Sequence, residues 1–205
     1  TCKLLLNIQN EIVVASLLGD GLRSWNYNRG KGILRITHCK EQNKYLLWKS
    51  SFFKDKLIYK HTNGGKSFQT SPLIELSTIY KDWYGEKTKK YKIPNNINLT
   101  PLIAAIWYMD DGNLNDSDKL SIELSTHCFD HSSQLFLISL LNKIGVKAKI
   151  RERTNRDGEK VELITIGREG SKRFFSYCHE FIHPSMAYKI PKDFHSNIGS
   201  HISLL

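Results

Sequence analysis

The sequence lacks long hydrophobic runs, paired cysteines and an excess of acidic residues. No apolar stretch approaches the roughly 18 residues that a membrane-spanning helix needs. The four cysteines are scattered without a C-x-x-C pair, so they predict neither a disulfide framework nor a zinc site. What remains is a chain of 205 residues, 40% of them hydrophobic and 24% charged, which is typical of one large globular domain or of two small ones that share a core.

Basic residues outnumber acidic ones. The 30 Lys and Arg residues stand against 20 Asp and Glu residues, which gives a net charge of +10. This balance favours a polyanionic partner, because neutralising phosphate groups releases counterions and supplies affinity that does not depend on sequence. Solvated surface lysines would give the same net charge, so charge alone does not select a nucleic acid.

Three short motifs recur in the same order at nearly constant spacing, which indicates an internal repeat. They are Asp20-Gly21 and Asp111-Gly112, 91 residues apart, Thr37-His38-Cys39 and Thr126-His127-Cys128, 89 residues apart, and Tyr91-Lys92-Ile93-Pro94 and Tyr188-Lys189-Ile190-Pro191, 97 residues apart. We therefore expect two copies of one structural unit, with a first domain at residues 1–96 and a second at residues 97–205.

The two copies also share a pattern of predicted elements. Period-two stretches predict strands at residues 22–27, 32–39, 56–61 and 67–71, and again at 120–127, 146–154 and 160–166. Apolar residues at helical spacing predict helices at residues 45–52, 72–84, 135–141 and 171–181, in addition to the apolar run before each Asp-Gly pair. Asn63-Gly64-Gly65 and Asp157-Gly158 predict hairpin turns, and Gly145 a helix end. The predicted fold class is α+β, with two pseudo-symmetric αββαββα repeats.

One predicted strand carries positive charge on a single face. Lys147, Lys149, Arg151 and Arg153 alternate with apolar residues and therefore point the same way, whereas Glu152 points to the other face. Four cations side by side repel one another unless an anion meets them. An outer face with mixed counterions is the simpler alternative, but a two-stranded ribbon fits the major groove of DNA, so we expect this face to bind nucleic acid.

Two apolar runs end in aspartate. Residues 13–21 read V-V-A-S-L-L-G-D-G, and residues 104–112 read A-A-I-W-Y-M-D-D-G. The end of a helix carries unpaired carbonyl groups and the negative end of the helix dipole, so an aspartate there costs up to about 1 kcal/mol when exposed. A cation removes this cost, because a carboxylate and a helix-end carbonyl are oxygen ligands that Mg²⁺ accepts. Asp-Gly is also a common turn pair, and this is the alternative.

These motifs resemble the two signature motifs of LAGLIDADG homing endonucleases of the single-chain, two-repeat type. The stretch W-Y-M-D-D-G at residues 107–112 is a specific match, and the resemblance covers nearly the whole chain. It implies that the two motif helices pack side by side at a pseudo-twofold axis and that their terminal aspartates meet at the minor groove. It also implies that the two antiparallel sheets form a DNA-binding saddle.

The resemblance also implies roles for particular residues. Asp20 and Asp111 would be catalytic and would hold two or more Mg²⁺ ions between themselves and DNA phosphates, helped by the backbone carbonyls of Gly19 and Asp110. Further catalytic candidates are Lys92 and Lys189, either of which could instead belong to a structural turn. Candidates for contact with DNA are Arg23, Arg35, Lys147, Lys149, Arg151 and Arg153, and candidates for contact with backbone phosphates or water are Thr37, His38, Thr126 and His127.

The function implied is that of a site-specific, Mg²⁺-dependent endonuclease that hydrolyses one phosphodiester in each strand of DNA. We expect a monomer, a long and imperfectly symmetric target, 3′ overhangs and a role in intron mobility. Family habit favours an organelle, a mitochondrion or a chloroplast. The alternatives are an RNA-binding intron maturase of the same fold, whose partner is intron RNA, and a DNA-binding regulator.

Overall fold

The chain folds into helices and antiparallel sheets in the computed structural model, which describes residues 7–19, 32–84, 92–116, 120–155, 157–202 and 205. The first set of elements is α1 (Asn7–Leu18), β1 (Arg35–His38), η1 (Lys40–Gln42), α2 (Asn43–Ser51), β2 (Lys56–Lys60), β3 (Lys66–Thr70) and α3 (Ile74–Tyr84). The second set is α4 (Pro101–Asp111), β4 (Gly112–Asp116), β5 (Ser121–Leu124), α5 (His131–Lys143), β6 (Ala148–Thr154), β7 (Lys160–Ile166) and α6 (Arg168–Cys178). The short helices η2 (His179–Phe181), η3 (Pro184–Lys189) and η4 (Lys192–Phe194) follow.

The α+β fold class is therefore confirmed. The second set follows the order αββαββα in full, and it includes β4, a strand that sequence patterns missed. In the first set, the strand expected at residues 22–27 lies outside the described residues. The division of the chain at residues 96 and 97 stays a prediction. Among the described residues, none of the helices has the length and apolarity needed to cross a bilayer.

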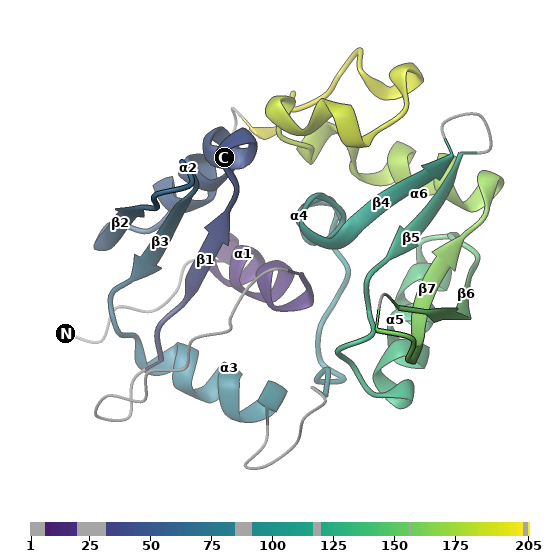
Figure 1. Ribbon diagram of the computed structural model, residues 1–205, viewed down its shortest axis with the longest axis horizontal. Coiled ribbons are helices and arrows are strands. Elements are labelled where there is room, and N and C mark those ends of the chain that lie inside the picture. Colours follow the sequence, from purple (N-terminus) through teal and green to yellow (C-terminus); the bar gives the residue numbers. More distant parts are fainter. Residues whose placement is uncertain (1–6, 20–31, 85–91, 117–119, 156, 203–204) are drawn as a thin grey trace.

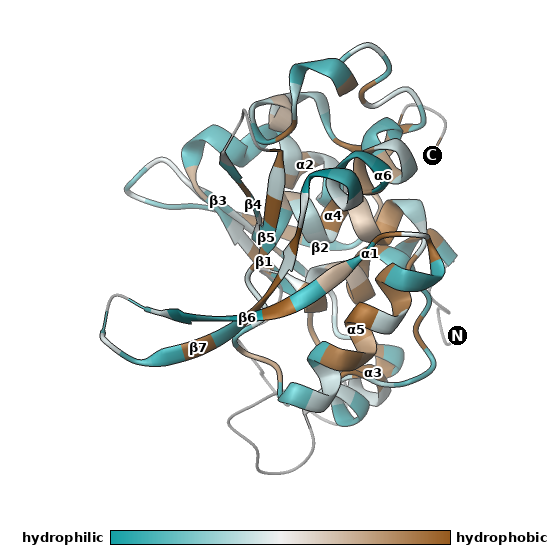
Figure 2. Cartoon of the chain, turned by 90° about the vertical axis from the view of Figure 1, so that its right-hand side faces the viewer, coloured by the Kyte–Doolittle hydropathy of each residue, from teal (hydrophilic) through white to brown (hydrophobic). Residues whose placement is uncertain are grey.

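The strands form two separate sheets, one from each set. The strand orders are β1-β3-β2 and β4-β5-β7-β6, and all neighbouring strands are antiparallel. The two sheets lie on either side of the central helices α1 and α4 (Figure 1). The view in Figure 2 shows most helices on one side of the molecule and the strands on the other, with the β6–β7 hairpin projecting outward. Each sheet thus buries one face and leaves the other open.

Local sequence signals set several element boundaries. Thr100 caps α4, because its hydroxyl oxygen accepts a hydrogen bond from the backbone N–H of Ile103 at 3.2 Å, and a proline follows it at the first helical position. Asp130 caps α5 in the same way through Ser133 at 2.8 Å. Gly145, with φ of +78°, ends α5 as predicted, and the turn glycine of the β6–β7 hairpin has φ of +80°.

Helices α1 and α4 pack against each other in the middle of one continuous apolar core. The second half of α1 and most of α4 are buried on nearly all sides, which is why neither stretch shows a polar face in the sequence. Their C-terminal ends approach closely at Gly19, where an added Cβ would lie 2.5 Å from the Cβ of Asp110. Only glycine fits this crossing without moving α4.

We predict that Gly19→Ala destabilises the protein by about 1–3 kcal/mol, because the new methyl group must push the end of α4 away. For a chain of this size, that corresponds to a fall of about 3–10 °C in Tm, measurable by circular dichroism. The matched control is Gly167→Ala, where an added Cβ meets no atom within 4 Å. Equal Tm values for the two variants would contradict the close packing of the helix ends.

Candidate functional site

The candidate site lies where α1 and α4 end side by side. Asp111 is the last residue of α4 and is half-buried. The residue before it, Asp110, touches Gly19 just beyond the end of α1. Asp20 and Arg23 lie outside the described residues, so their positions stay predictions. The described neighbours of the two predicted catalytic aspartates are in contact across the helix pair.

A lysine binds the carbonyl groups at the end of α4. The ammonium group of Lys189 donates to the carbonyl oxygens of Met109 at 2.6 Å, Gly112 at 3.1 Å and Asp110 at 3.4 Å. The hydroxyl group of Tyr108 donates in turn to the carbonyl of Lys189, which fixes the segment on α4. The negative end of the helix dipole therefore already attracts a cation.

This donor set suits a hard divalent ion. Carboxylate and carbonyl oxygens are the ligands that Mg²⁺ and Ca²⁺ prefer. Here the Asp111 carboxylate lies next to the backbone carbonyl of Asp110, which already accepts a hydrogen bond from the Lys189 ammonium. No group of three His, Cys, Asp or Glu side chains suited to a metal occurs within the described part of the chain. A metal would therefore depend on Asp111, on backbone carbonyls and on groups outside that part, Asp20 among them.

The carboxylate of Asp110 faces the protein interior. Its oxygens accept hydrogen bonds from the hydroxyl of Tyr45 at 2.8 Å and from the ammonium of Lys49 at 2.9 and 3.1 Å. Both charged side chains are completely buried. Lys49 neutralises this carboxylate, so Asp110 would serve a cation through its backbone carbonyl, the group that the resemblance implies as a ligand.

A histidine completes this buried cluster. The Nε2 atom of His38 lies 3.7 Å from the nearer carboxylate oxygen of Asp110. Burial, together with the positive charge of Lys49, lowers the pKa of His38 to about 3, so the imidazole is neutral at neutral pH. The counterion of Asp110 is therefore Lys49.

Sequence reasoning missed Tyr45 and Lys49 as members of the site, although one signal was present. Residues 45 and 49 of α2 and residue 52 at its C-terminal cap fall on one stripe, since they are spaced by four and three. Tyr45 and Phe52 are apolar members of that stripe, so the spacing places Lys49 on the side of the helix that faces the core. This signal concerns the position of Lys49 on the helix and does not identify its partner.

The two lysines of the repeated Tyr-Lys-Ile-Pro motif have different surroundings. Lys189 is half-buried against the end of α4, whereas Lys92 is exposed. The backbone next to Lys92 is fixed to the second repeat, because the N–H of Ile93 donates to the hydroxyl of Ser133 on α5 at 3.0 Å. Lys189 therefore lies at the candidate site, whereas the side chain of Lys92 points to solvent.

The predicted basic face is found on the open side of the second sheet. Lys149, Arg151 and Arg153 are exposed on β6, and Lys147 is exposed just before it. The sequence analysis expected this face to bind nucleic acid, with mixed counterions as the alternative. Arg153 has such a counterion, because its guanidinium lies 2.8 Å from a carboxylate oxygen of Glu123 on β5. The partner comes from a strand that is not adjacent in sequence.

The open face of the first sheet carries fewer charges. Arg35 is exposed on β1, its Nε donates to the side-chain oxygen of Gln69 at 3.1 Å, and its guanidinium lies 5.7 Å from the ring centre of Tyr59. Thr37 shares this face by the alternation of the strand, whereas His38 points into the core.

Two further candidates are structural. Thr126 is fully buried, where its hydroxyl donates to the side chain of Gln134 at 3.0 Å and accepts from the N–H of Ile164 at 3.1 Å. His38 is also buried. These two side chains were expected to contact backbone phosphates or water, and the phosphate part of that expectation was wrong because neither side chain reaches the surface. Thr37 and His127 are exposed and stay candidates.

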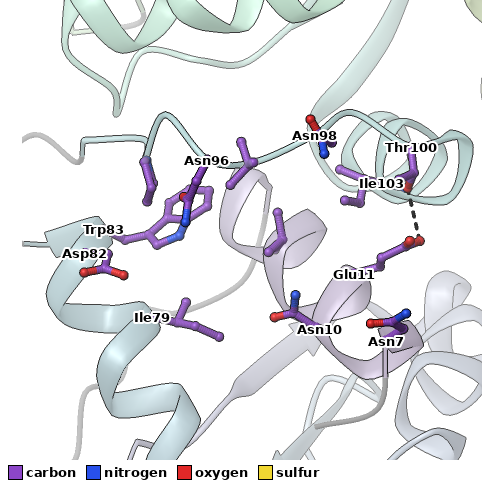
Figure 3. Close-up of a pocket in the computed structure, with 13 residues that line it drawn as sticks. Asn7, Asn10, Glu11, Ile79, Asp82, Trp83, Asn96, Asn98, Thr100 and Ile103 are labelled. Atoms are coloured by element: carbon purple, nitrogen blue, oxygen red, sulfur yellow. Dashed lines mark hydrogen bonds between the residues drawn. The ribbon is translucent and has the colours of Figure 1, made fainter.

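A cavity of about 320 Å³ lies at the opposite ends of the same two helices. It is lined by Asn7 and Glu11 of α1, by Trp83 of α3 and by Thr100 before α4, and the Thr100 hydroxyl donates to Glu11 at 3.1 Å (Figure 3). Since Gly19 and Asp111 lie at the C-terminal ends, this cavity is separate from the candidate site.

Comparison with known proteins agrees with the geometry. The sequence model of the LAGLIDADG DNA endonuclease family matches residues 10–174. "Protein RecA" of Mycobacterium gastri is 30% identical over 94% of this chain and 49% of its own length. "Cytochrome b mRNA maturase bI2" of Saccharomyces cerevisiae is 28% identical over 87% of this chain and 46% of its own length. The chain thus spans about half the length of these curated relatives.

Solved structures share the fold. The homing endonuclease I-WcaI bound to its DNA recognition sequence has a TM-score of 0.74 at 22% identity, covering 91% of this chain and 87% of that one. I-DmoI in complex with DNA and Ca has a TM-score of 0.53 at 15% identity, covering 87% of this chain and 96% of that one. With the family match across more than half of the sequence, the protein belongs to the LAGLIDADG DNA endonuclease family.

Proposed function

We propose that the protein is a site-specific endonuclease that hydrolyses one phosphodiester in each strand of duplex DNA and leaves 3′ overhangs. It acts as a monomer on a long, imperfectly symmetric target, because its two halves carry different side chains. The observation that supports this most directly is the meeting of the α1 and α4 ends, with Asp111 at the junction and an open sheet face on either side.

The proposed chemistry depends on Mg²⁺ held by Asp111 and Asp20, with the carbonyls of Asp110 and Gly19 as further ligands. A bound Mg²⁺ ion lowers the pKa of water and neutralises charge on the reacting phosphate. Lys189 neutralises the end of α4, so that a phosphate can approach two aspartates without full repulsion. Lys92, exposed on the other repeat, would approach the second phosphate only when DNA binds. Relatives of the same fold have been solved with Ca, Mn and Mg, which supports a divalent ion.

The proposed DNA-binding surface consists of the open faces of the two sheets. Arg35 on β1 and the basic residues of β6 would contact phosphates or base edges, and Arg23 is a further candidate from outside the described residues. A hairpin such as β6–β7, which projects from the body, has the shape that enters a major groove (Figure 2).

An intron maturase is the second candidate, because one curated relative is a cytochrome b mRNA maturase that matches 87% of this chain. A maturase would bind intron RNA and would not need both aspartates. The two functions are separated by whether duplex DNA is cut when a divalent ion is supplied.

We predict that Asp111→Asn and Asp20→Asn each abolish double-strand cleavage and leave DNA binding in Ca²⁺ within about threefold of wild type. Losing a metal-binding carboxylate removes several kcal/mol of transition-state stabilisation, which corresponds to about 100-fold or more in rate. The substrate is obtained by selecting cleavable sites from a randomised DNA library with Mg²⁺ present. Undiminished cleavage by both variants would refute the proposed site.

We also predict that Lys149→Ala and Arg151→Ala each weaken DNA binding about three- to tenfold. Each should also reduce the slope of log K against log salt concentration by about one, the value for one lost phosphate contact. Fluorescence anisotropy at several salt concentrations measures both effects. Lys172→Ala on α6, an exposed lysine paired with Glu169, is the matched control. Binding isotherms that match the control would show that the β6 face does not bind DNA.

A further inference from the structure

We propose that Lys49 and Tyr45 are positioning residues, which hold the end of α4 through the carboxylate of Asp110 and thereby place Asp111 for catalysis. This inference rests on the proposed function. It assigns a task to a cluster that would otherwise be only a structural contact, and it concerns side chains that touch neither DNA nor metal.

The first support is the depth and geometry of the cluster. Among the residues whose burial the structure describes, Lys49 and Asp110 are the only Lys, Arg, Asp or Glu residues that are buried. Burying a charge pair costs several kcal/mol per ion, so a pair persists only with close contact and further hydrogen bonds. Both conditions are met, since Lys49 bonds both carboxylate oxygens and Tyr45 adds a third bond.

The second support is that the cluster holds the residue directly before Asp111. The end of a helix usually frays, because its last carbonyl groups lack partners. Here the side chain of Asp110 is fixed on one side of α4 and Lys189 binds the terminal carbonyls on another. With the last turn fixed from two sides, the position of Asp111 at the end of α4 is also fixed.

The third support is that the cluster joins the two repeats. Lys49 and Tyr45 belong to α2, which also packs against β1 and β3 of the first sheet, whereas Asp110 belongs to the second repeat. Gly19 leaves room for the Asp110 side chain to cross between the helices. The position of Asp111 is therefore set relative to the sheet of the opposite repeat.

The buried charged cluster has no equivalent at the corresponding positions of the other repeat. Applying the 89-residue spacing of the Thr-His-Cys motif, the counterparts of Tyr45 and Lys49 are Gln134 and Ile138, which carry no charge. By the 91-residue spacing of the Asp-Gly motif, the counterpart of Asp110 is Gly19. Loosening the cluster should therefore disturb Asp111 more than Asp20, and the two DNA strands should respond unequally.

The test is Lys49→Met, with Lys44→Met on the exposed side of the same helix as the matched control. Nicking of each strand is followed separately on end-labelled duplex across a range of Mg²⁺ concentrations. We expect Lys49→Met to slow one strand about 10- to 100-fold more than the other, since a misplaced catalytic group costs rate on this scale. DNA binding in Ca²⁺ should stay within about threefold of wild type, and the control should match wild type in both assays.

A second readout needs neither metal nor DNA. Amide hydrogen exchange, followed by mass spectrometry, should become at least about tenfold faster at the last turn of α4 in Lys49→Met and stay unchanged in α1. Tm should also fall, on the order of 10 °C, because Asp110 is left buried without its counterion.

Two more variants keep the inference testable if Lys49→Met unfolds. Tyr45→Phe removes one hydrogen bond and keeps the ion pair, so it should show the same strand imbalance to a smaller degree. Lys49→Met with Asp110→Asn removes both charges, so it should regain most of the lost Tm and keep the imbalance. Recovery of Tm together with equal nicking of both strands would show that the cluster is structural only.

The outcomes also separate this inference from the proposed function. Lys49→Met that behaves like Lys44→Met, or that slows both strands equally, would overturn the positioning role. If the wild-type protein does not cut duplex DNA with Mg²⁺, the proposed function itself fails, and if Asp111→Asn and Asp20→Asn both cut as well as wild type, the proposed site fails. If Asp111→Asn loses cleavage and Lys49→Met behaves like wild type, the positioning role is overturned and the proposed function stands.

Discussion

The meeting of two helix C-termini is the constraint on which the rest of the structure depends. Helices α1 and α4 lie side by side, and α4 ends in two consecutive aspartates where dipole, carbonyl groups and carboxylates are all negative. Positive charge stabilises such an end. The protein supplies it twice, with Lys49 on the carboxylate of Asp110 and with Lys189 on the terminal carbonyls. Asp111 directly follows these two fixed groups as the last residue of α4.

The arrangement of the sheets follows from the same central pair. Because α1 and α4 occupy the middle, each sheet lies beside them with one face on the shared core and one face open (Figure 1). The alternation of β6 then sends its apolar residues inward and its cations outward. An open surface with basic strands at its edge suits a long, stiff polyanion, whereas the cavity at the other ends of the helices is far too small for a duplex.

Local features of this fold could be predicted from the sequence, but partnerships across the chain could not. The positive-φ glycines Gly64, Gly145 and Gly158, the end of α4 at Asp111 and the repeated strand pattern depend on neighbours in sequence. The pairing of Lys49 with Asp110 joins residues from different repeats, and that of Arg153 with Glu123 depends on the strand order β4-β5-β7-β6. Neither follows from periodicity, which says which face a side chain occupies and not what lies opposite.

The buried ion pair also bears on why the two repeats are joined in one chain. Near a twofold axis a residue faces its own counterpart, so in a symmetric dimer the position of Asp110 would face a second aspartate. An added Cβ at Gly19 would already lie 2.5 Å from the Cβ of Asp110, which leaves no room for two side chains. Two carboxylates at that distance would also repel each other. A glycine on one side and an aspartate on the other solve both problems, and this requires that the two halves differ in sequence. A single chain with diverged repeats can therefore hold one end of the central helix pair by a charge that a symmetric dimer could not accommodate.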